Sequence, residues 1–194
     1  MVCTDPFEAA SFEARPCLIV SVGSNGDFSF ETAVHAAYPR CTIHVFDGTP
    51  GKSDTWAKLA PKWLTYHATH FYAGSWKSFV GAGSTRRLPT VTVLKMDCEG
   101  CEFEALPSFL EHTCTEQVLC ELHGTGTGPR SSVGLLKHLN ASYGVYYAEP
   151  AHSMLLWRKL VTQLLSCTNK CTSAVNSLQL RYLNYIEEFH RRSP

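Results

Sequence analysis

The 194-residue sequence lacks an excess of charge of either sign, because 17 basic residues balance 17 acidic ones. Its basic residues also form no long run; Arg86-Arg87 and Arg191-Arg192 are examples of the short pairs that occur. Proteins that bind a nucleic-acid backbone cluster Lys and Arg on one face or in one segment. The charge pattern therefore argues against nucleic acid as the main partner.

Long apolar runs are also missing, and none approaches the ~20 residues that cross a bilayer. The first 16 residues, MVCTDPFEAASFEARP, contain early acids and lack the apolar centre of a signal peptide. The nine cysteines are odd in number, and Cys17, Cys41 and Cys120 fall in apparent strands. We therefore expect no membrane span, reduced thiols and a cytoplasmic location. A leader missing from this sequence would instead indicate the secretory pathway.

The length and an ordinary composition, 44% hydrophobic and 18% charged, fit one α/β domain. We predict a single domain over residues 1–194, with a core at about 17–150 and an irregular segment at 151–194. Short apolar runs alternate with stretches of helical periodicity, which predicts a doubly wound parallel sheet. The predicted strands are 17–22, 42–47, 64–72, 91–94, 117–123 and 144–148, and the helical stretches are 27–38, 56–64, 101–110 and 131–139. In the tail, 157–165 has helical spacing and 178–182 alternates like a strand.

Residues 91–110, VTVLKMDCEGCEFEALPSFL, form the most informative stretch. A buried strand is followed by an acidic turn with a glycine and then by a helix. In parallel sheets ligands bind beyond the carboxyl ends of the strands, where Asp97 and Glu99 would lie. Acids in a first helical turn are favoured by the helix dipole, by ~0.3–1 kcal/mol each, which suffices for Glu99 or Glu102. Asp97 is explained less well, because a carboxylate beside a buried strand needs a partner.

A second candidate site is the turn Gly23-Ser24-Asn25-Gly26 after the first strand. Small residues there let backbone N–H groups approach an anionic group at a helix start, although the turn is not a full G-x-G-x-x-G. Asp47 follows the next strand, roughly 20 residues on, where α/β nucleotide-binding folds bind a ribose hydroxyl. The alternative is that Asp47-Gly48 simply forms a turn.

Glu121 and His123 are two residues apart at the end of a predicted strand and so share a face. A histidine is suited to general-base chemistry, and Glu121 could orient it. Alternatively, Asp97, Glu121 and His123 could together hold a hard divalent cation, or His123 could be a strand-end histidine with a structural hydrogen bond.

Two cysteine pairs, Cys98-x2-Cys101 and Cys167-x3-Cys171, have spacings found in zinc sites. Cys98 and Cys101 stand among carboxylates at a helix start, which makes core or incidental thiols the better interpretation. We therefore predict no zinc site.

The acidic turn resembles a known family. Residues 95–102, KMDCEGCE, resemble the K-[IM]-D-x-E-G-x-E signature of FkbM-type methyltransferases, and 21–31, SVGSNGDFSFE, resemble the first motif of that group. Residues 45–47 and 120–124 follow in the same order, so the resemblance covers about 17–150. It implies a class I S-adenosylmethionine-dependent methyltransferase fold: a Rossmann-like three-layer α/β/α structure with seven strands, the last antiparallel.

The resemblance also implies roles for single residues. Gly23, Ser24, Asn25 and Gly26 would lie against the methionine part of S-adenosylmethionine, Asp47 and Gly48 against its ribose, and Asp97 where methyl donor and substrate meet. Two departures stand out. Ser21 occupies a position where many class I enzymes have an acid, and the tail beyond residue 150 suggests a last strand only at 177–183.

The sequence thus predicts an S-adenosylmethionine-dependent methyltransferase that methylates a hydroxyl of a sugar or other small molecule. Asp97 or His123 would take the proton of the acceptor, with Glu121 as a third catalytic residue. The alternative is a catalytically inactive methyltransferase-like module that binds a partner through the apolar stripe at 157–165. These two differ in whether Asp97, Glu121 and His123 converge. A nicotinamide-dependent oxidoreductase is less favoured, because the first turn lacks the third glycine.

Overall fold

The computed structural model describes residues 16–72, 74–78, 89–123, 132–140, 143–149 and 154–159. Strands and helices alternate over most of this part of the chain, as predicted, and each of the six predicted strands overlaps an observed one. The elements are β1 (Leu18–Val22), α2 (Ser29–Ala37), β2 (Thr42–Phe46), α3 (Ser53–Leu59), β3 (Thr65–His67), the 3₁₀ helix η1 (Ser75–Ser78), β4 (Thr90–Met96), α4 (Glu102–His112), β5 (Cys114–Glu121), α5 (Ser132–Asn140), β6 (Tyr143–Glu149) and β7 (Met154–Lys159).

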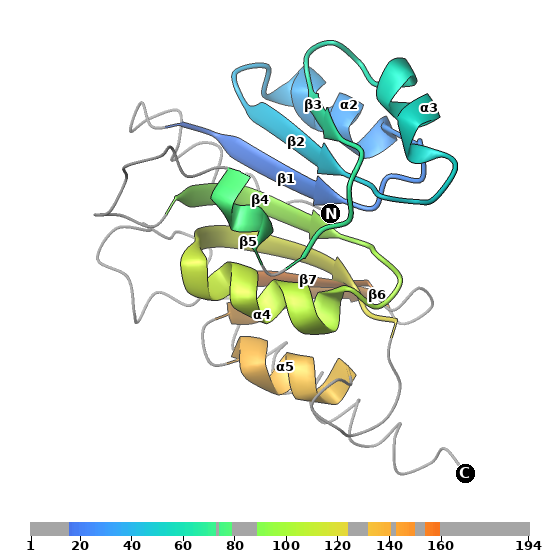
Figure 1. Cartoon of the computed structure of the whole chain (residues 1–194). Coiled ribbons are helices and arrows are strands. Elements are labelled where there is room, and N and C mark those ends of the chain that lie inside the picture. Colours follow the sequence, from blue (N-terminus) through green and yellow to red (C-terminus); the bar gives the residue numbers. More distant parts are fainter. Residues whose placement is uncertain are drawn as a thin grey trace.

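The strands form one seven-stranded sheet in the order β3-β2-β1-β4-β5-β7-β6 (Figure 1). Strands β3, β2, β1, β4 and β5 pair in parallel, whereas β7 is antiparallel to both β5 and β6. The predicted doubly wound, mostly parallel sheet with an antiparallel last strand is therefore confirmed.

The position of that last strand was predicted wrongly. Residues 157–159 end β7, although their spacing predicted a helix, and the expected strand at 177–183 lies outside the described residues. The run MLLW at the start of β7 is apolar without a clear period, and such a run fits a buried strand as well as a helix. Hydrogen bonding to β5 and β6 makes it a strand.

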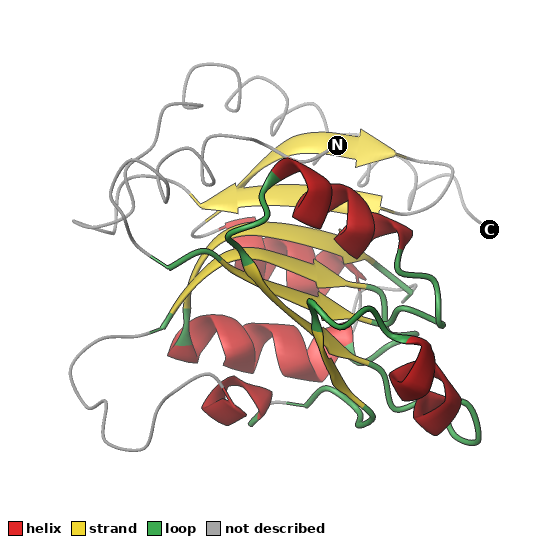
Figure 2. Ribbon diagram, turned by 90° about the horizontal axis from the view of Figure 1, so that it is seen from above, coloured by secondary structure: helices red, strands yellow, loops and turns green. Residues whose placement is uncertain are grey.

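The sheet lies between two layers of helices (Figure 2). On one face Val20, Leu94 and Phe109 belong to a core that α4 and α5 cover. On the other face Ile19 and Val34 belong to a core under α2. Ile19 and Val20 are neighbours in β1 and both are fully buried, which explains why that strand is a continuous apolar run.

The described helices are short. The longest, α4, has 11 residues and continues through Pro107. None of the helices described is long and apolar enough to cross a membrane. Before α2, the Asp27 carboxylate accepts a hydrogen bond from the Ser29 N–H at 2.8 Å, although the N-cap residue is Phe28.

Four cysteines form disulfides, Cys17–Cys41 and Cys98–Cys101. The expectation of reduced thiols is wrong for these four cysteines. Reduced thiols therefore no longer support the predicted cytoplasmic location, because disulfides persist mainly in oxidising compartments. The first pair forms because β1 and β2 are parallel neighbours whose starts adjoin, with the Thr42 N–H donating to the Cys17 carbonyl at 2.9 Å. Cys98 and Cys101 cannot ligate zinc while they are bonded to each other, and residues 167–171 lie outside the described part.

Two histidines at the sheet edge predict a dependence of stability on pH. His44 Nδ1 and His67 Nε2 lie 2.9 Å apart, and burial lowers the pKa of both rings, with His67 lowering that of His44 further. The unfolded chain, with an ordinary pKa near 6.5, then binds more protons than the folded one at mildly acidic pH. The free energy of unfolding should therefore fall as pH decreases below about 6.5.

Urea unfolding at pH 8 and pH 5.5 measures this difference. His44→Gln should reduce it, whereas His70→Gln, at an exposed histidine, should leave it unchanged. An equal pH dependence in all three proteins would contradict the assignment to the His44–His67 pair.

Candidate active site

Four polar segments meet at the carboxyl edge of the sheet. The turn from Gly23 follows β1, Asp47 follows β2, Asp97 follows β4, and His123 lies two residues beyond β5. These strands are neighbours in the order β2-β1-β4-β5. Helix α2, after β1, and α4, after β4, pack on opposite faces of the sheet. Ligands of open α/β sheets bind at such a switch point, so this edge is the candidate site.

Asp47 holds the glycine turn. Its Oδ2 accepts hydrogen bonds from the backbone N–H groups of Ser24 at 3.0 Å and Asn25 at 2.8 Å. Its Oδ1 accepts the N–H and hydroxyl of Thr49 at 3.0 and 2.7 Å. Burial alone would raise the pKa of Asp47, but these hydrogen bonds outweigh burial and lower it. The carboxylate is therefore ionised at neutral pH and fixes the turn where a ligand would lie.

The glycines of the turn are required by close packing. Gly23 has φ +76°, and a Cβ there would lie 1.6 Å from the carbonyl oxygen of Asp97. Gly26 also has φ +76°, and its Cβ would meet the Trp56 indole at 2.5 Å. Lys95 Nζ donates to the Gly23 carbonyl at 2.7 Å. The turn after β1 and the turn after β4 are thus in direct contact.

This contact predicts that Gly23→Ala destabilises the fold by about 3 kcal/mol or more, from left-handed backbone strain plus a clash with main chain. Gly51→Ala is the matched control, because Gly51 has φ +74° but a Cβ added there would meet no atom within 4 Å, and it should cost only about 1–2 kcal/mol. Chemical unfolding measures both. Equal losses would show that the close approach to Asp97 contributes nothing.

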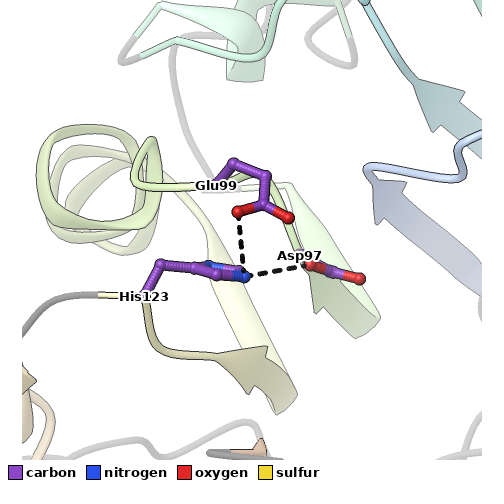
Figure 3. A group of neighbouring side chains, drawn as sticks. All are labelled: Asp97, Glu99 and His123. Atoms are coloured by element: carbon purple, nitrogen blue, oxygen red, sulfur yellow. Dashed lines mark ion pairs between the residues drawn. The ribbon is translucent and has the colours of Figure 1, made fainter.

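His123 stands at the centre of the acidic groups (Figure 3). Its Nε2 lies 3.5 Å from Asp97 Oδ1, 3.6 Å from Glu99 Oε2 and 4.0 Å from Glu121 Oε1. The side chain of His123 is 20% exposed and that of Glu99 86% exposed, so the group opens to solvent. Asp97, Glu121 and His123, which the sequence predicted as one catalytic or cation-binding group, therefore lie close together.

Glu102 orients His123. Its Oε1 accepts the backbone N–H of His123 at 2.8 Å and lies 3.2 Å from Nδ1 of the ring. Its Oε2 accepts the Gly100 N–H at 2.9 Å. The carboxylate is completely buried, and these contacts satisfy it. It joins the turn after β4 to the end of β5 and directs Nε2 toward the opening.

The site has a strongly negative environment. Burial raises the pKa of the Cys120 thiol well above its usual value, and the carboxylates of Glu102, Asp97 and Glu121 raise it further. Cys120 is therefore a protonated core thiol and not a nucleophile.

Two residues of this arrangement, Glu102 and Lys95, were not expected from the sequence. The orienting role was predicted for Glu121, which lies on the Nε2 side of the ring, whereas Glu102 contacts Nδ1. No role was predicted for Lys95. Both residues belong to the KMDCEGCE signature, and that motif was the signal that could have identified them. Gly48 has a packing role here, because a Cβ on it would lie 2.4 Å from the backbone nitrogen of His70.

Comparison with known proteins identifies the family. Residues 1–151 match the model of the family Methyltransf_22, a methyltransferase domain. The chain belongs to this methyltransferase family. A search of curated proteins gives no match. The FkbM subtype predicted from residues 95–102 stays a prediction.

Two solved structures are similar to the chain in fold. Human methyltransferase-like protein 13 in complex with SAH has 16% sequence identity and a TM-score of 0.57, over 93% of this chain and 84% of that one. The fibrillarin pre-rRNA processing protein of Methanococcus jannaschii has 10% identity and a TM-score of 0.51, over 75% and 66%. Together with the strand order, these similarities define a Rossmann-like class I methyltransferase fold.

Proposed function

We propose that the protein is an S-adenosylmethionine-dependent methyltransferase that methylates a hydroxyl of a sugar or other small molecule. The observation that carries this proposal is the convergence of Asp97, Glu121 and the Glu102-oriented His123 beside the glycine turn. Family membership supports methyl transfer, and the arrangement supplies a proton acceptor at the strand edge where a cofactor would bind.

The residues of the turn fit S-adenosylmethionine. Gly23, Asn25 and Gly26 all have positive φ, so the chain reverses sharply before α2 begins. The turn lies at the strand edge that also carries Asp47 and Asp97, where ligands of such sheets bind. Its Ser24 and Asn25 N–H groups donate to Asp47 and are not left for an anionic ligand as the sequence predicted, so the turn would contact the cofactor in the shape that Asp47 gives it. The SAH bound to human methyltransferase-like protein 13 supports the same class of cofactor here.

The bound cofactor supplies a methyl group that is already activated, so the protein has to align the acceptor and remove its proton. His123 Nε2 accepts the hydroxyl proton while Nδ1 donates to Glu102, whose buried carboxylate stabilises the ring in that orientation. Asp97 lies 3.5 Å from Nε2 and is 36% exposed, so it can accept a hydrogen bond from the acceptor.

The alternative of an inactive module has less support. It required a helical stripe at 157–165, but Trp157 belongs to β7. The two functions differ in whether Asp97, Glu121 and His123 converge on one open pocket or are filled by side chains, and a carboxylate oxygen of Asp97 and one of Glu121 both lie within 4.0 Å of His123 Nε2.

Calorimetric titration with S-adenosylmethionine and with its demethylated product tests the cofactor. We expect micromolar binding of both. A screen of sugars and small-molecule hydroxyls with a labelled methyl donor then tests the reaction, with Asp97→Ala expected to bind cofactor but lose turnover. A folded protein that binds neither ligand would reject the function. Turnover unchanged in Asp97→Ala would reject the role of Asp97.

A further inference from the structure

The geometry around His123 points to a metal site. We propose that Asp97 Oδ1, Glu99 Oε2 and His123 Nε2 bind one divalent transition-metal cation, for which Mn²⁺ serves as the probe. The site itself is argued from geometry alone, and its part in methyl transfer rests on the proposed function.

The spacing of the three ligand atoms suits a shared cation. They lie within 4.8 Å of one another, and Nε2 is 3.5 Å and 3.6 Å from the two carboxylate oxygens. Ligands bound at about 2.0–2.2 Å around one ion stand roughly 3–3.5 Å apart. The side chains come from the end of β4, the turn that follows and the end of β5, and they point toward one another (Figure 3). Small side-chain movements would complete the coordination.

The imidazole distinguishes this group from an exposed acidic patch. The Nδ1 atom of His123 faces the buried carboxylate of Glu102, and its Nε2 atom faces Asp97 and Glu99. A buried carboxylate behind the histidine is the usual support of a metal-binding imidazole, because it fixes the tautomer and the ring orientation.

The negative charge of the carboxylates around His123 Nε2 also favours a bound cation. Asp97, Glu99 and Glu121 all face Nε2, yet among the described residues no lysine or arginine forms an ion pair with them. The nearby Lys95 directs its ammonium to the Gly23 carbonyl instead. A divalent cation bound at this point would be attracted by all three carboxylates.

The ligand types select the class of metal. One imidazole with two or three carboxylates suits Mn²⁺, Fe²⁺ or Zn²⁺, whereas Mg²⁺ prefers oxygen ligands throughout and keeps its water. Three protein ligands leave coordination positions for an acceptor hydroxyl, whose pKa the metal would lower. In the metal-loaded protein this would replace the proton transfer to His123 Nε2 proposed above, because Nε2 would be a ligand, and Glu121, 4.0 Å from Nε2, would receive the proton instead.

Titration of the 194-residue chain with Mn²⁺ after dialysis against EDTA tests the site. Binding is monitored by calorimetry and by the loss of the electron paramagnetic resonance signal of free Mn²⁺. We expect one Mn²⁺ per chain at micromolar affinity and weaker binding of Mg²⁺. Glu99→Gln and His123→Ala should each weaken Mn²⁺ binding about 10–100-fold, as should Glu102→Gln behind the ring. Glu111→Gln, at an exposed acid on α4, is the control and should bind as the wild type does.

Absence of stoichiometric Mn²⁺ binding by the folded chain would overturn the proposal, and so would binding that both Glu99→Gln and His123→Ala leave unchanged. Circular dichroism of each variant checks folding, and Glu99→Gln is informative even if His123→Ala unfolds, because Glu99 is 86% exposed. Cofactor binding measured in EDTA tests the methyltransferase function separately. Mn²⁺ binding without cofactor binding would therefore reject that function and keep the metal site.

Discussion

His123→Ala should lower the rate of methyl transfer by about 10²–10⁴-fold, the usual contribution of a positioned proton acceptor, and should leave the affinity for S-adenosylmethionine within a few-fold of the wild type. The reason is geometric. The ring lies at the end of β5 among Asp97, Glu99 and Glu121, whereas Asp47 holds the glycine turn from β2. Single-turnover rates at saturating cofactor measure the first effect and calorimetry the second.

Glu102→Gln separates orientation from proton transfer. The amide keeps the size of the side chain and one acceptor oxygen, but it loses the charge that stabilises the His123 ring. We expect a smaller loss of kcat than in His123→Ala, little change in KM, and no additional loss when both substitutions are combined, because the two residues act as a unit. Additive losses in the double variant would show that Glu102 acts independently of His123.

Much of the fold follows from local sequence patterns. The apolar run at 17–22 predicted a strand, and its residues Ile19 and Val20 pack into cores on opposite faces of the sheet. β7 could not be predicted in this way, since an apolar run of that length does not show whether β5 and β6 will pair with it. The disulfide between Cys17 and Cys41 likewise depends on two strands becoming parallel neighbours.

The site was predictable as far as it lies at strand ends. Asp47, Asp97 and His123 follow buried strands, and parallel neighbours bring their carboxyl ends together. The role of Glu102 did not follow from local pattern, because an acid in a first helical turn already has a sufficient local explanation, and only its place in the KMDCEGCE signature pointed to it. Its contact with His123 forms only because the start of α4 packs beside the end of β5, a pairing of residues 21 positions apart.

Asp47→Ala should weaken the binding of S-adenosylmethionine by at least 100-fold and destabilise the fold by about 2–4 kcal/mol. The substitution removes the acceptor of the Ser24, Asn25 and Thr49 N–H groups at once. Hydrogen bonds to a charged group contribute about 1.5–3 kcal/mol each, but the Asn25 and Thr49 donors are only partly buried and can bond to water instead, so the net loss is smaller than the sum of three bonds. The turn would then lose the conformation in which it faces the cofactor.

Asp54→Ala is the matched control, because Asp54 is an exposed acid on α3. It should bind cofactor normally.

The pH dependence of cofactor binding gives a second check. The hydrogen bonds lower the pKa of Asp47 despite burial. The stabilisation that the Asp47 carboxylate gives to the fold is therefore complete above the ordinary carboxyl pKa near 3.9, and it is lost only as the pH falls through the lower pKa that Asp47 has in the folded protein. Cofactor affinity should therefore hold at pH 5 in the wild type. Wild-type affinity in Asp47→Ala would mean that the cofactor does not depend on the turn that Asp47 holds.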